Sequence, residues 1–186
     1  MEFFKTGKFD YEKTLLATRH YADPDAVGAM DFIGLNFYAN PVIGLNTTNF
    51  FGPTCFPGQK MGDLALTVDP EGLGAAIEQC AALHKPVFIT ELGVADTSDV
   101  LRQELVRRCL AVVDEKRKYL TVLGLFFWTF KSNYEWNHGY AKLFGMYRED
   151  GSKMASALIY EEYMQRNAWL PEEELGHQQK PGMAYS

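Results

Sequence analysis

The chain has 186 residues, 47% of them hydrophobic and 14% aromatic, so it can bury a sizeable core. This composition excludes a disordered chain or a coiled coil and indicates one globular domain, or a piece of a larger one. The formal net charge is −6 and no Lys/Arg-rich face is evident, which argues against a nucleic-acid partner.

The cysteines and the N-terminal residues indicate the cellular compartment in which the protein is expected. Cys55, Cys80 and Cys109 lack a metal-type spacing, so we expect packing residues of a reduced, intracellular protein with no metal and no cofactor. The first residues lack the pattern of a signal peptide, and no apolar stretch is long enough to span a bilayer. We therefore expect a soluble, cytoplasmic protein with no membrane partner.

Two strands and a helix are predicted first along the chain. Residues 31–38 are mostly apolar and predict a strand. Residues 71–85 carry apolar side chains at helical spacing on one face, and Pro86 ends this helix. The β-branched, apolar run over residues 87–91 then predicts a strand buried on both faces, as in a parallel sheet.

A second helix and a third strand follow. Thr97, Ser98 and Asp99 are expected to supply the N-cap of a helix that runs to about Lys118. Residues 121–130 are apolar and aromatic and predict a third buried strand. The alternation of strands and helices predicts an α/β fold with right-handed crossovers, a parallel sheet and all three strand ends on one face.

The last part of the chain is expected to hold a loop over residues 133–139 and a closing helix over residues 152–167. Residues 171–186 are rich in Glu, Gln, Gly and Pro and predict a flexible tail. The expected division is thus a domain over residues 1–170 and a tail over 171–186.

Glu91 is the most informative residue, because it places a carboxylate where a buried strand ends. In parallel α/β proteins the residues just past the strand ends build the active site. The alternative is structural: Glu91 caps the next helix or pairs with a buried Arg or Lys. The predicted topology gathers polar and aromatic residues at the same edge, namely Asn36, Tyr38, Trp128, Glu135 and Trp136.

Carboxylates among aromatic rings favour a carbohydrate ligand. A sugar ring has apolar faces that stack on indole and hydroxyls that donate to carboxylates. No glycine-rich phosphate loop is present, and core packing is the alternative for Trp128 and Trp136. From the residues alone, Glu91 and Glu135 would be the candidate pair of catalytic carboxylates.

Four segments resemble glycoside hydrolase family 1, the β-glucosidase family. They are Asp31-Phe-Ile-Gly-Leu-Asn-Phe-Tyr38, Pro70-Glu-Gly-Leu73, Val87-Phe-Ile-Thr-Glu-Leu-Gly93, and Trp128-Thr-Phe-Lys-Ser-Asn-Tyr-Glu-Trp136 with its continuation to Gly145. The resemblance implies a TIM (β/α)8 barrel of which these strands are the last three βα units, in the C-terminal part.

The resemblance also implies roles at the site. Glu91 matches the nucleophile that forms a covalent glycosyl-enzyme with net retention, and Tyr38 matches the tyrosine that orients it. Glu135 therefore becomes a sugar-binding residue rather than a second catalyst. The other implied substrate-binding residues are Asn36, Trp128, Trp136 and Phe144.

Departures from the family pattern limit what the chain does alone. The Asn-Glu-Pro motif of the acid/base is absent, although a retaining mechanism needs a second carboxyl about 5 Å from the nucleophile. Three βα units are also well short of the roughly 250 residues of a barrel. We therefore expect a fragment that needs an N-terminal barrel half or self-association. Leu92 and Lys131-Ser132 replace the usual Asn and Leu-Asp.

Three functions stay open at this point. The first is a retaining β-glycosidase that hydrolyses a β-linked, unphosphorylated glycoside, since the Glu135-Trp136 pair is kept. The second is a non-catalytic remnant that binds sugar or a partner. The third is another retaining glycosidase family on the same fold, against which the loop from Glu135 to Tyr140 argues.

Overall fold

The computed structural model describes residues 2–13, 17–40, 42–44, 52–55 and 57–167, so the expected tail lies outside the described residues. Within these ranges thirteen elements follow one another: α1 (Glu2–Thr6), β1 (Lys8–Lys13), β2 (Ala17–Ala22), η1 (Pro24–Ala26), β3 (Ile33–Phe37), β4 (Val42–Gly44), β5 (Gly52–Thr54), α2 (Pro70–Ala81), β6 (Val87–Leu92), α3 (Val100–Arg117), β7 (Val122–Leu125), η2 (Trp136–His138) and α4 (Ala155–Asn167).

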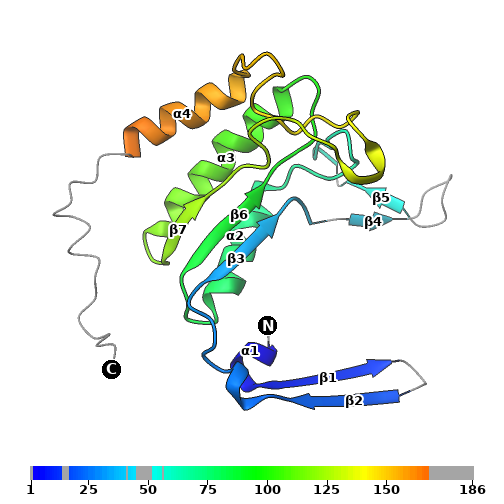
Figure 1. Cartoon of the computed structure of the whole chain (residues 1–186), viewed down its shortest axis with the longest axis vertical. Coiled ribbons are helices and arrows are strands. Elements are labelled where there is room, and N and C mark those ends of the chain that lie inside the picture. The colour runs from blue at the N-terminus through cyan, green and yellow to red at the C-terminus, as the bar shows by residue number, and fades with distance from the viewer. Residues whose placement is uncertain (1, 14–16, 41, 45–51, 56, 168–186) are drawn as a thin grey trace.

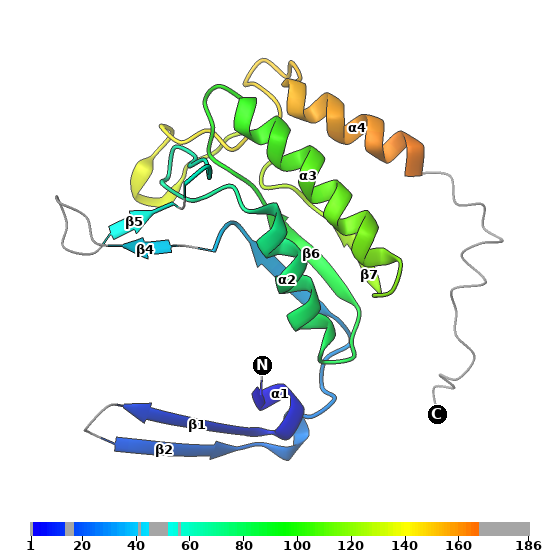
Figure 2. The same cartoon turned by 180° about the vertical axis from the view of Figure 1, so that it is seen from behind.

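A three-stranded parallel sheet forms the centre of the molecule, in the order β3-β6-β7. Helices α2 and α3 lie along one face of this sheet, and α4 packs beside α3 (Figures 1 and 2). The core lies between the sheet and these helices, where Leu73, Ile77, Val87, Ile89 and Val106 are fully buried. The predicted α/β fold with parallel strands is confirmed.

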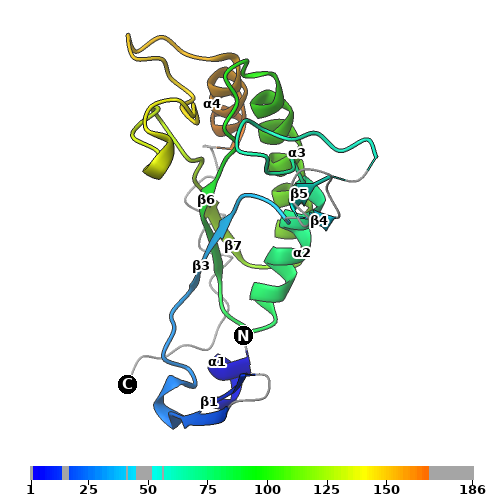
Figure 3. The ribbon, with the colours of Figure 1, turned by 90° about the vertical axis from the view of Figure 1, so that its right-hand side faces the viewer.

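Two small hairpins flank this sheet. Strands β1 and β2 pair antiparallel and, with α1, lie near the start of β3, whereas β4 and β5 pair near its end (Figures 1 and 3). Neither hairpin was predicted, because short strands with mixed polar and aromatic residues give no clear periodicity. The carboxyl ends of β3, β6 and β7 thus lie away from the first hairpin.

The predicted boundaries needed three corrections. The first helix ends at Ala81 rather than at residue 85, because His84 adopts a positive φ of 57°. The third strand covers only Val122–Leu125, so Trp128 lies beyond it in the following loop. The last helix begins at Ala155, after the turn at residues 149–151.

The N-cap of α3 lies within the predicted trio, but the side chain that caps the helix is that of Asp96. Asp99 occupies the N-cap position with φ 65° and makes no capping hydrogen bond with its side chain. The Asp96 carboxylate instead accepts from the backbone N–H groups of Leu101 at 2.7 Å and Arg102 at 3.2 Å. Its other oxygen accepts from the amide and hydroxyl of Ser98. A carboxylate at a helix N-terminus also interacts favourably with the helix dipole.

This cap predicts a loss of stability in acid. Burial acts to raise the pKa of Asp96, but hydrogen bonds from Ser98, Arg102 and Leu101 outweigh burial and lower it. Because the folded pKa lies below the unfolded one, the stabilisation is complete above the unfolded pKa and is lost as pH falls through the folded value. In urea unfolding at pH 6 and pH 3, Asp96→Asn should show a smaller pH dependence than wild type. Equal pH dependence in the two proteins would contradict the assignment.

Candidate active site at the strand ends

A bulge in β6 determines where the Glu91 side chain points. Leu35 of β3 pairs with Ile89, but the next residue, Asn36, pairs with Glu91, so Thr90 is the extra residue. Ile89 and Leu92 are both fully buried in the core, and strict alternation would have turned Glu91 toward the core as well. The bulge therefore places both Thr90 and Glu91 away from the core, as bulges beside active sites commonly do.

Tyr38 holds the Glu91 carboxylate. The Tyr38 hydroxyl, one residue past β3, donates to Glu91 Oε2 at 2.6 Å. Burial, this hydrogen bond and the negative charges of Glu91 and Glu135 together raise the pKa of Tyr38 well above its ordinary value. The raised pKa keeps the phenol protonated, so that it can donate to the carboxylate. It leaves Oε1 of Glu91 free of this contact.

Phe144 and Glu135 complete the group around Tyr38. The Phe144 ring is 4% exposed and meets the Tyr38 ring edge-on, with 6.1 Å between centroids. Glu135 lies close enough for its charge to raise the pKa of Tyr38. The loop after β7 thus brings an aromatic ring and a second carboxylate to the Tyr38–Glu91 pair.

Asn36 lies beside this group and is oriented by a residue that sequence reasoning missed. Thr90 Oγ1 donates to Asn36 Oδ1 at 2.6 Å. Since Oδ1 is the acceptor in this bond, the amide Nδ2 of Asn36 is the atom left to donate to a ligand. Thr90 could not be identified from sequence, because its orientation depends on the bulge.

The two predicted tryptophans are placed differently. Trp128 is partly buried, and its backbone N–H donates to the Leu92 carbonyl at 2.8 Å, which ties the loop after β7 to the end of β6. Trp136 has a positive φ of 44° and is 84% exposed. The structure therefore does not pack Trp136 against Tyr38 or Glu91.

The contact between Gly93 and Trp128 predicts a steric effect. A Cβ at Gly93 would lie 2.2 Å from the Trp128 carbonyl oxygen, whereas a Cβ at Gly34 would lie 3.4 Å from the Thr90 side chain. Gly93→Ala should therefore displace the loop after β7, which holds Trp128. It should lower the free energy of unfolding by about 1–3 kcal/mol, as overpacking does. Chemical denaturation monitored by tryptophan fluorescence measures the loss. Gly34→Ala is the control, and an equal effect of both changes would refute the contact.

Two departures from the family pattern have a structural explanation. Leu92 is fully buried in the core, so its change from the usual residue alters packing rather than the site. Ser132 Oγ accepts from the Gly145 N–H at 2.8 Å, so this position keeps a hydrogen-bond acceptor. Lys131 extends to the Glu149 carbonyl at 2.8 Å.

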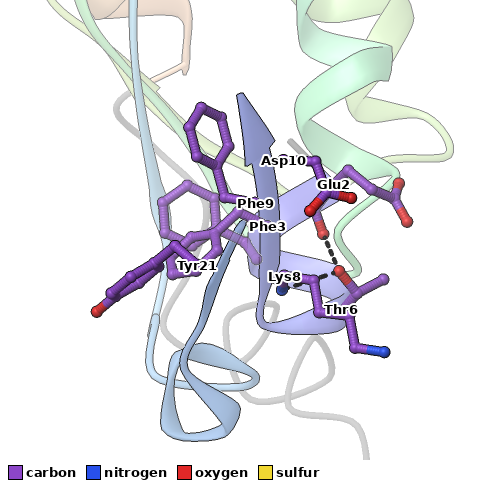
Figure 4. Close-up of a pocket in the computed structure, with 8 residues that line it drawn as sticks. Glu2, Phe3, Thr6, Lys8, Phe9, Asp10 and Tyr21 are labelled. Atoms are coloured by element: carbon purple, nitrogen blue, oxygen red, sulfur yellow. Dashed lines mark hydrogen bonds between the residues drawn. The ribbon is translucent and has the colours of Figure 1, made fainter. Parts of the chain in front are cut away.

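The Tyr38–Glu91 group is distinct from a hollow on the first hairpin. That hollow is lined by α1, β1 and β2, including Phe3, Phe9 and Tyr21 (Figure 4), and none of the predicted site residues lines it.

Among the described residues no cluster of His, Cys, Asp or Glu has the arrangement of a metal site. Of the helices that the structure describes, none is long and apolar enough to cross a membrane. Cys80 and Cys109 are buried, as expected of packing residues.

Parallel strands with covering helices and a carboxylate at the strand ends are consistent with part of a (β/α)8 barrel, and the chain shares this fold with solved β-glycosidases. No protein-family model matches the chain. The β-glycosidase from Pyrococcus horikoshii superimposes with a TM-score of 0.71 at 26% identity, covering 97% of this chain and 43% of that one. The crystal structure of a β-glucosidase from Pyrococcus furiosus gives a TM-score of 0.63 at 28% identity, covering 78% and 35%.

Curated relatives point the same way. β-Glucosidase 6 of Oryza sativa is 30% identical over 186 residues, covering 76% of this chain and 35% of the relative. Galactolipid galactosyltransferase SFR2 of Arabidopsis thaliana is 30% identical over 145 residues, covering 72% of this chain and 22% of the relative. The predicted resemblance to glycoside hydrolase family 1 is confirmed: the chain is similar to part of its β-glycosidases. It spans between about a fifth and a third of these two curated relatives.

Proposed function

We propose that the chain contributes the nucleophile half of a retaining β-glycosidase active site. The observation that supports this most is the 2.6 Å hydrogen bond from Tyr38 to Glu91 at the carboxyl ends of adjacent parallel strands. Carboxylates at this edge of a barrel are positioned for catalysis. The names of the relatives, β-glucosidase and β-galactosidase, give the class of reaction.

In this proposal, Glu91 Oε1 attacks the anomeric carbon while the bond to the leaving oxygen breaks. A protonated carboxylic acid gives its proton to the leaving group, and a covalent glycosyl-enzyme results. The deprotonated carboxyl then takes a proton from water, which attacks from the opposite face and releases the sugar with retention. Asn36, Trp128, Glu135, Trp136 and Phe144 are the proposed sugar contacts, and Trp136 would have to turn inward to serve.

The acid/base in this proposal comes from a complementary barrel segment. Within the described residues, β3 and β7 each pair with one neighbour in the sheet, so each has an unpaired edge. On β7 and the segment after it, Leu123 and Phe126 are 55% and 57% exposed. Unpaired strand edges beside exposed apolar side chains favour a partner that adds further strands. Such a partner could be an N-terminal barrel half or a second copy of the chain.

Covalent trapping tests the proposed nucleophile. The chain would be mixed with the N-terminal part of a family 1 barrel and treated with a 2-deoxy-2-fluoroglycoside, which slows release of the glycosyl-enzyme. Peptide mass spectrometry should find the sugar on Glu91. A label on another carboxylate would refute the proposal. Sugar binding without labelling or turnover would instead support the non-catalytic remnant.

Glycosyl transfer is a second candidate, favoured by the relative named as a galactolipid galactosyltransferase. The same glycosyl-enzyme would then pass its sugar to an acceptor hydroxyl rather than to water. Product analysis with and without an added acceptor glycoside separates the two fates. Free sugar as the sole product at high acceptor concentration would exclude transfer.

A further inference from the structure

A buried arginine joins the loops on either side of the candidate site. Arg102 is 2% exposed, and its Nη1 donates to Asp99 Oδ1 at 2.7 Å. Its Nη2 donates to two backbone carbonyls, that of Asp96 at 2.6 Å and that of Leu143 at 2.5 Å. One guanidinium therefore links the loop after β6 to the loop after β7.

The connected loop leads directly to the Tyr38–Glu91 pair. Leu143 precedes Phe144, whose ring meets that of Tyr38, and Tyr38 donates to Glu91. The Leu143 carbonyl also accepts from the Asp96 N–H at 3.0 Å. A chain of direct contacts thus runs from Arg102 through the loop after β7 to the proposed nucleophile.

The same network fixes the start of α4. Asp99 Oδ2 accepts from the Ser156 N–H at 2.9 Å, and Asp99 Oδ1 accepts from the Ser156 hydroxyl at 2.6 Å. Asp99, Arg102 and Ser156 are all buried. Buried charges are costly unless paired and hydrogen-bonded, and a shift of the loop would take the Leu143 carbonyl away from Arg102 Nη2 and the Asp96 N–H. The network therefore favours the observed position of the Leu143 carbonyl.

We propose that Arg102 is a positioning residue of the candidate site, which holds the segment from Leu143 to Phe144 against Tyr38 and thereby orients Glu91. The catalytic meaning of this role rests on the proposed function. The planar guanidinium is required, because it donates from two nitrogens in fixed directions to an ion-pair partner and to carbonyls. A lysine ammonium has the charge without this geometry.

The test uses the full chain and needs no turnover. Arg102→Lys and Arg102→Met would be compared with Arg108→Met, a change on the same helix at an arginine bound to the surface carboxylates of Glu71 and Glu104. Hydrogen exchange would follow the Asp96 and Gly145 amides in the two loops. NMR of ¹³C-labelled tyrosine, assigned with Tyr38→Phe, would follow the Tyr38 ring.

Both Arg102 variants should accelerate exchange at Asp96 and Gly145 by about tenfold or more relative to the mid-α3 amide of Leu110, because a charged, buried hydrogen bond is lost. They should also shift the Tyr38 signal, whereas Arg108→Met should do neither. An unchanged Tyr38 signal, or equal acceleration at all three amides, would overturn the proposal and leave Arg102 a purely structural residue.

A further variant covers the case in which neither Arg102 variant folds. Phe144→Leu removes the ring edge that contacts Tyr38 and leaves the buried network intact. It should then shift the Tyr38 signal by itself, and an unshifted signal would overturn the proposal. Trapping of Glu91 in the wild type tests the proposed function separately, since the loop and ring measurements do not depend on a glycosyl-enzyme.

Discussion

Glu91→Gln is expected to abolish glycoside turnover by the chain combined with the N-terminal part of a family 1 barrel. The loss should be on the order of 10⁴-fold or more, as for other nucleophile substitutions. Glutamine keeps the size and polarity of the side chain but is a poor nucleophile. Because Tyr38 can still donate to the amide oxygen, the site should keep its geometry. The loss should therefore appear in kcat, measured by release of a chromogenic leaving group.

Glu135→Gln is the matched comparison, because Glu135 lies near Tyr38 but is proposed to bind the sugar rather than to attack it. It should raise KM more than it lowers kcat. Azide should also restore turnover to Glu91→Ala, since a small anion fits the space of the lost carboxylate, and should give a glycosyl azide of inverted configuration. If Glu135→Gln eliminated kcat and Glu91→Gln did not, the two carboxylates would exchange roles.

Asp99→Asn is expected to lower the free energy of unfolding by about 3–5 kcal/mol, the cost of leaving a buried charge without its partner. Asp99 and Arg102 have side chains only 5% and 3% exposed. Asparagine has nearly the same shape and tolerates a positive φ, so the φ of 65° at this position adds no strain. The change removes the charge and one of the two oxygens that accept from Arg102 and Ser156, and urea unfolding would measure the combined loss.

Glu104→Gln provides the surface control on the same helix. Glu104 pairs with Lys60 and Arg108 near the surface, where an ion pair contributes at most about 1 kcal/mol. The double variant Asp99→Asn, Arg102→Met should be more stable than Asp99→Asn alone, because it removes the uncompensated charge. If Asp99→Asn and Glu104→Gln lowered the free energy of unfolding equally, burial would not explain the contribution of the Asp99–Arg102 pair to stability.

The strand and helix order followed from the sequence because it depends on local patterns. Apolar runs at residues 31–38 and 87–91 and the helical spacing at residues 71–85 each predicted an element that the structure contains. Burial on both faces of a parallel strand requires such runs. Glu91 and Tyr38 were predicted as site residues for the same reason, since each stands at the end of one of these runs.

The tertiary structure alone decided which way Glu91 points and what holds it there. With strict alternation from Ile89, Glu91 would face the core, and only the bulge at Thr90 turns it out. A bulge depends on pairing with β3, which local sequence does not encode. The Arg102 network likewise joins residues 41 positions apart, Arg102 and Leu143, through a backbone carbonyl. The position of a backbone carbonyl is set by packing between segments, which local sequence does not encode. The sequence therefore determined that a carboxylate, Glu91, stands at the end of a buried strand, and the tertiary structure determined the direction in which it points and the residues that hold it.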